Sequence, residues 1–177
     1  MEEKLVVPEN DFQEKDAAAK KIVRKYMLWS MGGGLIVIPI VDVVAVTTAQ
    51  VYMLKDLAEN YDVEFSGDRV KSLIASLMGG ASANYLAYGG LGRMAANSLM
   101  KVVPIAGQIF GGVAMSIFSS ATTYAVGKVF IQHFASGGTF LDFDPEKVRA
   151  YFSKEFEEGK ELATEMKKDQ ETQEVTA

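Results

Sequence analysis

The sequence predicts an all-α protein, a glycine-rich apolar bundle of helices or helical hairpins with polar helices at its two ends. Two observations favour helices. Charged residues are concentrated at the ends of the chain, and Gly and Pro divide the apolar middle into runs long enough for helices. A third observation disfavours strands. Residues 35–46 are rich in β-branched residues, but no second run of this kind is present to pair with them.

Charge is distributed unevenly along the 177 residues, which carry 18 Lys+Arg and 23 Asp+Glu for a net charge of −5. Residues 26–141 contain only six basic and six acidic residues. No acid occurs between 69 and 141, where the charged residues are Arg69, Lys71, Arg93, Lys101 and Lys128. This apolar and locally basic middle fits anionic lipid headgroups, whereas the net charge gives no attraction towards nucleic acid.

The first part of the chain is expected to be a flexible leader over residues 1–15, followed by an apolar helical domain over residues 16–141. A helix is predicted from Asp16, because Ile22, Tyr26 and Trp29 follow at spacings of four and three. Trp29 suits two roles equally, an anchor at an interface or the first aromatic residue of a packed core.

A break in the helix is predicted near residues 32–41. Gly32-Gly33-Gly34 weakens the helix there, and Pro39 cannot donate a backbone hydrogen bond to the preceding turn. Asp42 is placed to cap a new helix that runs from Val43 to about Asn60.

Helix boundaries are also marked in the second half of the chain. Ser66 is a predicted N-cap, Pro104 marks a boundary before a long helix from Ile105 to Phe134, and Ser136-Gly137-Gly138 ends that helix. Asp144-Pro145 starts an amphipathic C-terminal helix within residues 142–168, and residues 169–177 are expected to be a disordered tail.

Three windows are long and apolar enough to be considered as membrane spans, residues 26–54, 72–92 and 102–127. Asp42, in the middle of the first window, argues for a re-entrant hairpin there. In the third window, small residues recur at helical spacing and predict a close helix–helix contact, within the chain, between copies or in lipid; they are Gly107, Gly111, Gly112 and Ser116.

The sequence lacks the common signatures of catalysis and of metal or cofactor binding. The absence of Cys and the single histidine, His133, exclude Cys-ligated metals and multi-histidine sites. Lys128 is followed by Val, so the phosphate-binding loop is missing, and the G-x-G-x-x-A run at residues 90–95 lacks its downstream acid. His133 is expected near a helix end, where an imidazolium favours the helix dipole. The sequence therefore predicts no catalytic residue, no cofactor and no metal.

Three motifs resemble a bacterial family. They are P-x-x-D (Pro39, Asp42), T-x-x-Q-V-x-M around Gln50, and L-A-x-x-Y ending at Tyr61. Together they resemble the YcjF-type domain family of unknown function, which includes inner-membrane proteins and domains linked to Era-like GTPases; EcsC-type proteins are more distantly similar. The resemblance covers about residues 17–134 and is sharpest over 34–61. It implies a membrane-associated helical module, in some members partnered with a GTPase, and it carries over no catalytic residue.

The predicted function is that of a non-enzymatic, membrane-associated helical scaffold or assembly module, at the cytoplasmic side of a membrane or in the inner membrane. The expected partners are membrane lipids, further copies of the chain and, by the resemblance, a separate GTPase; nucleic acid is not expected. The alternative is a soluble homo-oligomeric helical binding module of the cytoplasm, whose ligand the sequence does not identify.

Overall fold

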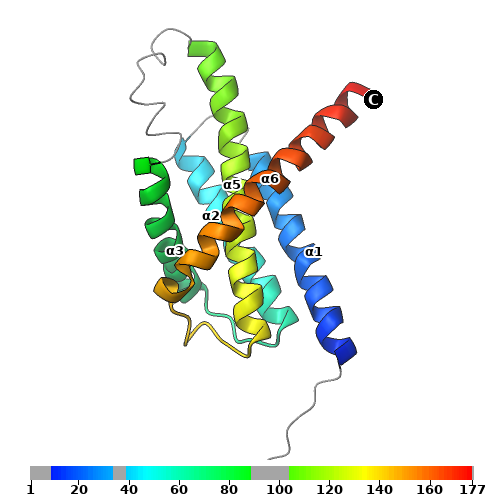
Figure 1. Cartoon of the computed structure of the whole chain (residues 1–177), viewed down its shortest axis with the longest axis vertical. Coiled ribbons are helices and arrows are strands. Elements are labelled where there is room, and N and C mark those ends of the chain that lie inside the picture. Colours follow the sequence, from blue (N-terminus) through cyan, green and yellow to red (C-terminus); the bar gives the residue numbers. More distant parts are fainter. Residues whose placement is uncertain (1–8, 34–38, 89–103, 177) are drawn as a thin grey trace, which may run out of the picture.

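The computed structural model describes the backbone of residues 9–33, 39–88 and 104–176, and the side chains of residues 10–31, 45–77 and 115–173. This described part contains helices and no strand, which confirms the all-α prediction. Four helices alternate in direction along the long axis of the molecule, and the last crosses them obliquely (Figure 1). The helices are α1 (Glu9–Gly33), α2 (Pro39–Asn60), α3 (Gly67–Tyr88), α5 (Pro104–Ala135) and α6 (Pro145–Thr176).

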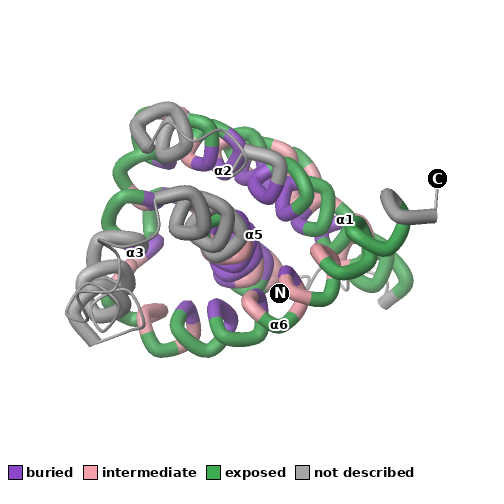
Figure 2. The backbone as a smooth tube through the Cα atoms, turned by 90° about the horizontal axis from the view of Figure 1, so that it is seen from above, coloured by how far each residue is buried: buried purple, intermediate pink, exposed green. Residues whose placement is uncertain are grey.

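The central helix of the bundle is α5. Seen from above, the other helices surround it and its buried residues occupy the middle (Figure 2). It packs against α6, α1, α2 and α3. Every residue from Ser119 to Gly127 is buried. A helix whose side chains are small and apolar on all sides is expected at the centre of a bundle. This position explains why α5 carries so little charge.

Two of the helices end in Schellman motifs, in which a residue with positive φ lets two backbone N–H groups reach the last carbonyls. At the end of α5, Gly138 N donates to the His133 carbonyl at 3.0 Å, and Gly137 has a φ of 82°. At the end of α2, Val63 N donates to the Ala58 carbonyl at 2.8 Å, and Asp62 has a φ of 56°. The predicted end of the long helix at residues 136–138 is thus confirmed.

The predicted helix starts after loops are confirmed as well. The Ser66 carbonyl accepts from Val70 N at 3.0 Å, so Ser66 occupies the N-cap position of α3. Asp144 Oδ1 accepts from Glu146 N at 3.0 Å, which caps α6 and leaves Pro145 at the first helical position. Pro104 likewise begins α5.

The predicted leader over residues 1–15 is too long, because α1 begins at Glu9. Acidic residues at 9 and 11 favour a helix N-terminus. The first turns are also fastened to the end of α2. Lys15 Nζ lies 2.8 Å from Asp62 Oδ2, and Asn60 Nδ2 donates to the Lys15 carbonyl at 3.0 Å.

The break between the first two helices is confirmed, since α1 ends at Gly33 and α2 begins at Pro39. The predicted cap at Asp42 is displaced. Because Pro at a first helical position loses no hydrogen bond, the helix starts at Pro39, four residues before the predicted start at Val43, and Asp42 lies in its first turn. The side-chain contacts of Pro39 and Asp42 lie outside the described residues, as does the backbone of residues 34–38. Residues 39–46 are helical, so the β-branched run at residues 35–46 does not form a strand over this part.

The C-terminal helix is longer than predicted. Residues 169–176 continue α6 to Thr176 instead of forming a disordered tail. This segment contains no Gly or Pro, and Lys167 and Glu171 stand four residues apart, a spacing at which opposite charges support a helix.

The first window considered as a membrane span does not form one continuous helix. Residues 26–54 are divided between α1 and α2. Among the helices of the described part of the chain, none contains an apolar stretch of the length needed to cross a bilayer.

Candidate functional site

The two ends of the bundle differ in charge. The end of α3 and the starts of α2 and α5 lie at the same end (Figure 1). Their terminal segments, residues 39–46, 78–88 and 104–114, contain a single formal charge, that of Asp42. We call this the uncharged end. At the opposite end, where α3 and α6 begin, charged residues and ion pairs gather, as in the Lys15–Asp62 pair. The helices α2, α3 and α5 are therefore polarised along the long axis, whereas the C-terminal half of α6, which also reaches towards this end (Figure 1), is charged.

Large hydrophobic side chains are also exposed on the described surface. Trp29 is 63% exposed and Tyr52 is 54% exposed. Tyr26 is buried beside Trp29, with ring centroids 5.6 Å apart in an edge contact. Of the two roles that the sequence left open for Trp29, the packed core is wrong.

A group of polar side chains is buried where α1, α2 and α5 meet. Ser30 Oγ lies 2.8 Å from Thr123 Oγ1, which also accepts from Gln50 Nε2 at 3.4 Å. Gln50 is fully buried, and its Oε1 has no hydrogen-bond partner. Ser120 Oγ, on the same helix as Thr123, is also buried without a partner. These contacts fix the register of the three helices, since a buried polar group is stabilised only by a matching group.

The motif residues of the sequence do not converge on one site. Pro39 and Asp42 lie at the uncharged end of α2, Gln50 faces the bundle interior, and Tyr61 follows the last turn of α2. Tyr61 packs its ring against Phe134 with centroids 6.1 Å apart, and burial raises the pKa of its hydroxyl above the ordinary value. The described members of these motifs thus hold α2 against α5.

Small residues allow close helix contacts at Gly127 and Gly159, which differ from the positions predicted from the sequence. A Cβ at Gly127 would lie 2.5 Å from Val23 Cγ2 of α1 and 3.3 Å from Met53 Sδ of α2. A Cβ at Gly159 of α6 would lie 3.0 Å from the backbone of Ala121 of α5. These two glycines let α5 approach three neighbours.

The predicted helix-packing residues lie nearer the start of α5. Gly107, Gly111 and Gly112 belong to the half of α5 at the uncharged end, and their contacts lie outside the described residues. Ser116 is described and is fully buried. The expectation that these four residues form the closest helix contact therefore stays a prediction.

An ion pair links α5 to α6 in the interior. Lys128 Nζ lies 3.6 Å from Glu155 Oε2, and the side chain of Glu155 is only 3% exposed. Glu155 Oε2 has no hydrogen bond, so the pair relies on charge attraction. The sequence contained a signal for this residue, because Glu155 lies on the buried face of α6 together with Phe152, Phe156, Gly159 and Ala163.

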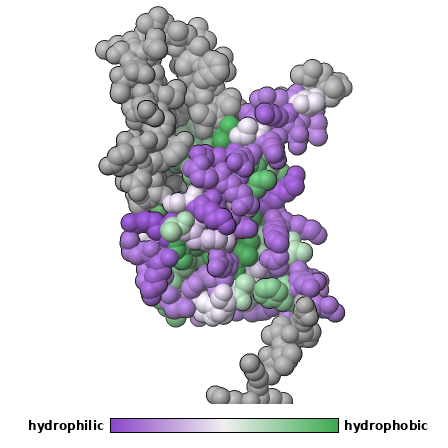
Figure 3. Space-filling model, viewed as in Figure 1, coloured by the Kyte–Doolittle hydropathy of each residue, from purple (hydrophilic) through white to green (hydrophobic). Residues whose placement is uncertain are grey.

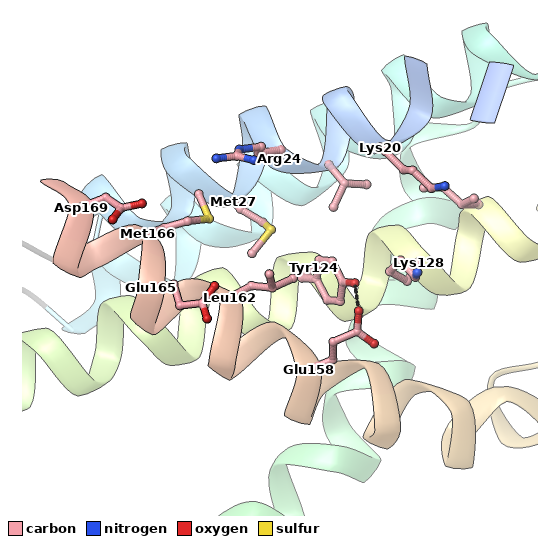
Figure 4. A pocket seen from close by; sticks show the side chains of 12 residues that line it. Lys20, Arg24, Met27, Tyr124, Lys128, Glu158, Leu162, Glu165, Met166 and Asp169 are labelled. Carbon is pink, nitrogen blue, oxygen red and sulfur yellow. Dashed lines mark hydrogen bonds between the residues drawn. The ribbon is translucent and has the colours of Figure 1, made fainter. Parts of the chain in front are cut away.

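An open groove of about 410 Å³ lies between α1 and α6, with α5 behind it. Three basic residues line it from α1 and α5, namely Lys20, Arg24 and Lys128, and three acidic residues line it from α6, namely Glu158, Glu165 and Asp169. The remaining lining residues are Val23, Met27, Tyr124, Ile131, Leu162 and Met166. The groove is therefore an apolar trough with walls of opposite charge (Figure 4). On the face shown in Figure 3, the described surface around α6 is mainly hydrophilic, with hydrophobic residues visible between the polar ones.

Tyrosines near the groove retain their protons strongly. Tyr124 Oη donates to Glu158 Oε1 at 2.6 Å. Burial, followed by this hydrogen bond, raises the pKa of Tyr124. Burial and the neighbouring carboxylate of Glu155 raise the pKa of Tyr151 to about 12 from an ordinary value of 10.0. Both hydroxyls thus stay neutral donors at physiological pH.

Stability at alkaline pH should depend on Tyr151. Because the folded protein holds this proton more tightly than the unfolded chain does, the contribution is complete below about pH 10 and is lost as the pH rises towards 12. Urea unfolding at about pH 9 and about pH 11.5 should show a smaller loss of unfolding free energy in Tyr151→Phe than in the wild type. Equal losses in the two proteins would contradict this assignment.

The histidine of the chain has a structural position, in the last turn of α5 as predicted. His133 Nε2 donates to the Thr139 carbonyl at 2.8 Å, and its ring meets the edge of Phe143 with centroids 5.0 Å apart. It thereby holds the connection between α5 and α6. Within the described residues, no cluster of His, Asp and Glu side chains has an arrangement that could hold a metal ion.

Comparisons with known proteins agree with the motif resemblance. The model of a family described as a domain of unknown function (DUF697) matches residues 9–161. A relative, magnetosome membrane protein 22 of Magnetospirillum gryphiswaldense, is 34% identical over 160 residues, which cover 90% of this chain and 80% of the relative. No solved structure matches. The family match covers α1, α2, α3, α5 and the first half of α6, and the chain therefore belongs to the DUF697 family, the YcjF-type family of unknown function.

Proposed function

We propose that this chain is a non-catalytic, membrane-associated helical assembly module whose uncharged end meets the lipid. The observation that carries the proposal is the polarity of the bundle. Residues 39–46, 78–88 and 104–114 of α2, α3 and α5 bring one charge to that end, and the charged C-terminal half of α6 ends to one side of these helices (Figure 1). The opposite ends of α2, α3 and α5 carry many charges. Charged groups are costly to transfer into lipid, by about 2.5–3.5 kcal/mol for an Asp at the bilayer centre, so only one end of this bundle suits such contact.

Two further observations support the proposal. The chain segment that joins α3 to α5 in sequence, residues 89–103, contains Arg93 and Lys101 and no acid, and basic residues near a membrane are attracted to anionic headgroups. The relative from Magnetospirillum gryphiswaldense is named as a membrane protein. Association at the surface or partial insertion of the uncharged end requires no helix that spans the bilayer.

Vesicle flotation tests this function. The wild-type chain should float with vesicles of phosphatidylcholine and phosphatidylglycerol. Phe110→Lys in α5 and Leu86→Lys in α3 should reduce the bound fraction about tenfold, since each adds a charge to the uncharged end. Leu141→Lys is the matched control, because Leu141 is 78% exposed in the connection between α5 and α6, and it should float like the wild type. Circular dichroism would verify that the variants remain helical.

The same experiment separates the alternative function. A wild-type chain that stays in the aqueous fraction, and elutes without detergent as a single multimeric species, would indicate a soluble homo-oligomeric binding module instead. We further propose that the chain self-associates at the membrane and acts as an accessory protein of a separate GTPase. The exposed Trp29 and Tyr52 support the first, and the resemblance to GTPase-linked members supports the second.

A further inference from the structure

The groove between α1 and α6 carries charge on both walls without neutralising it across the gap. Among the described residues, no ion pair joins α1 to α6. Lys20 pairs with Asp16 within α1, and Lys128 of α5 pairs with Glu155 of α6. Within the described part of the chain, the lining residues Arg24, Glu165 and Asp169 have no ion pair. Helices that merely packed together would be expected to bring such opposite charges into contact. Here the two walls remain apart, with apolar side chains between them.

The charges differ between the walls of the groove, with basic residues on α1 and α5 and carboxylates on α6. In Figure 4, Arg24 lies on the side of Met166 and Asp169, and Lys128 lies on the side of Glu158. The groove therefore offers cations and carboxylates on separate walls of a single apolar surface. A ligand that complements it has an anionic group, a cationic group and apolar atoms.

The volume limits the size of this ligand. About 410 Å³ lies in the range of pockets that bind small molecules. The groove is thus large enough for a small amphiphile.

We propose that this groove binds a zwitterionic amphiphile with a primary ammonium and a phosphate, the chemistry of a phosphatidylethanolamine headgroup. The phosphate lies at the basic residues, the ammonium at the carboxylates of α6, and the first acyl carbons on Met27, Leu162 and Met166. This inference rests on the proposed function, because it names the lipid class that a membrane-associated module would recognise.

The carboxylates of α6 select the ammonium. A primary ammonium can donate three hydrogen bonds to carboxylate oxygens, and charge-assisted bonds of this kind are strong. A quaternary choline group donates none and is usually held in a cage of several aromatic rings. The groove is lined by one aromatic ring, that of Tyr124, whose hydroxyl already binds Glu158. An anionic headgroup without an ammonium would leave the three carboxylates of α6 without a cationic partner.

Calorimetry with the full chain and short-chain lipids tests the proposal. Dihexanoyl phosphatidylethanolamine, used below its micelle concentration, should bind about tenfold more tightly than the choline and glycerol lipids of the same chain length. Glycerophosphoethanolamine, which lacks acyl chains, should bind more weakly than the lipid because it leaves the apolar floor uncovered. Equal binding of this soluble headgroup would overturn the lipid assignment.

Charge-neutral variants locate the site. Arg24→Gln and Glu165→Gln should each weaken ethanolamine-lipid binding about tenfold. Lys21→Gln on α1 and Glu161→Gln on α6 are the matched controls, since both residues are exposed and neither lines the groove, and they should bind as the wild type does. Unchanged binding in the groove variants, or equal affinity for the three short-chain lipids, would overturn the proposal.

The outcome is distinguishable from failure of the proposed function. Flotation with vesicles of phosphatidylcholine and phosphatidylglycerol alone depends on the uncharged end and not on the groove. Arg24→Gln and Glu165→Gln should therefore still float with those vesicles. If the wild-type chain floated with these vesicles but bound the three short-chain lipids equally, the groove assignment would be wrong and the proposed function would stand.

Discussion

Replacing Gly127 with alanine is expected to lower the unfolding free energy by about 1–3 kcal/mol, the usual cost of adding a methyl group to a filled core. The new Cβ would lie 2.5 Å from Val23 Cγ2 and 3.3 Å from Met53 Sδ. Val23 is buried and β-branched, so its side chain cannot rotate away. The gain of about 1 kcal/mol in helix propensity from Gly to Ala offsets only part of this cost. Urea unfolding monitored by circular dichroism measures the change.

Two companion variants isolate the steric cause. Val23→Ala vacates the space that the new methyl group needs, so the double variant Val23→Ala/Gly127→Ala should be more stable than the sum of the single changes predicts. Gly67→Ala is the matched control, because a Cβ there meets only Phe65 at 3.7 Å, an ordinary contact. If Gly127→Ala were as stable as the wild type, the close approach of α5 to α1 and α2 would be wrong.

The interior ion pair is expected to respond asymmetrically to the removal of its partners. Lys128→Met should lower the unfolding free energy by about 2–3 kcal/mol, because it leaves the Glu155 carboxylate buried without a compensating charge. The lysine is 26% exposed, which places the loss below that of a fully buried pair. Glu155→Leu should change stability by less than about 1 kcal/mol, since the lysine can turn its ammonium towards water and the leucine adds apolar packing.

The double variant completes the test of the ion pair. Lys128→Met/Glu155→Leu should be about as stable as Glu155→Leu, because no buried charge remains to be compensated. Chemical denaturation of the four proteins in the cycle supplies the coupling energy. Equal losses for the two single variants would show that the pair is solvated and that α6 does not bury Glu155.

The ends of the helices could be predicted from the sequence where a residue determines the backbone locally. Pro104, Ser66 and the Asp144-Pro145 pair mark helix starts because each satisfies or forbids a particular hydrogen bond. The position of Asp42 was predicted wrongly, because an Asp is favourable both as an N-cap and in the first turn of a helix. Only the conformation of the preceding residues distinguishes the two positions.

The groove could not be predicted, because its walls come from opposite ends of the chain. Arg24 and Glu165 are 141 positions apart, and no motif in the sequence links them. Their proximity follows from the oblique crossing of α6 over α5, which depends on Gly159 meeting the backbone of Ala121. A glycine in an otherwise polar helix gives no indication of its partner. Tertiary packing therefore decides this site.

The most direct measurement of the central claim is hydrogen–deuterium exchange of the full chain with and without vesicles. Lipid contact at the uncharged end should slow exchange in peptides from residues 39–46, 78–88 and 104–114, because lipid excludes water from those helix segments. Peptides from residues 56–71 and 139–149, at the charged end, should exchange at the same rate in both samples. Protection confined to the charged end, or no protection on vesicles, would contradict membrane association through the uncharged end.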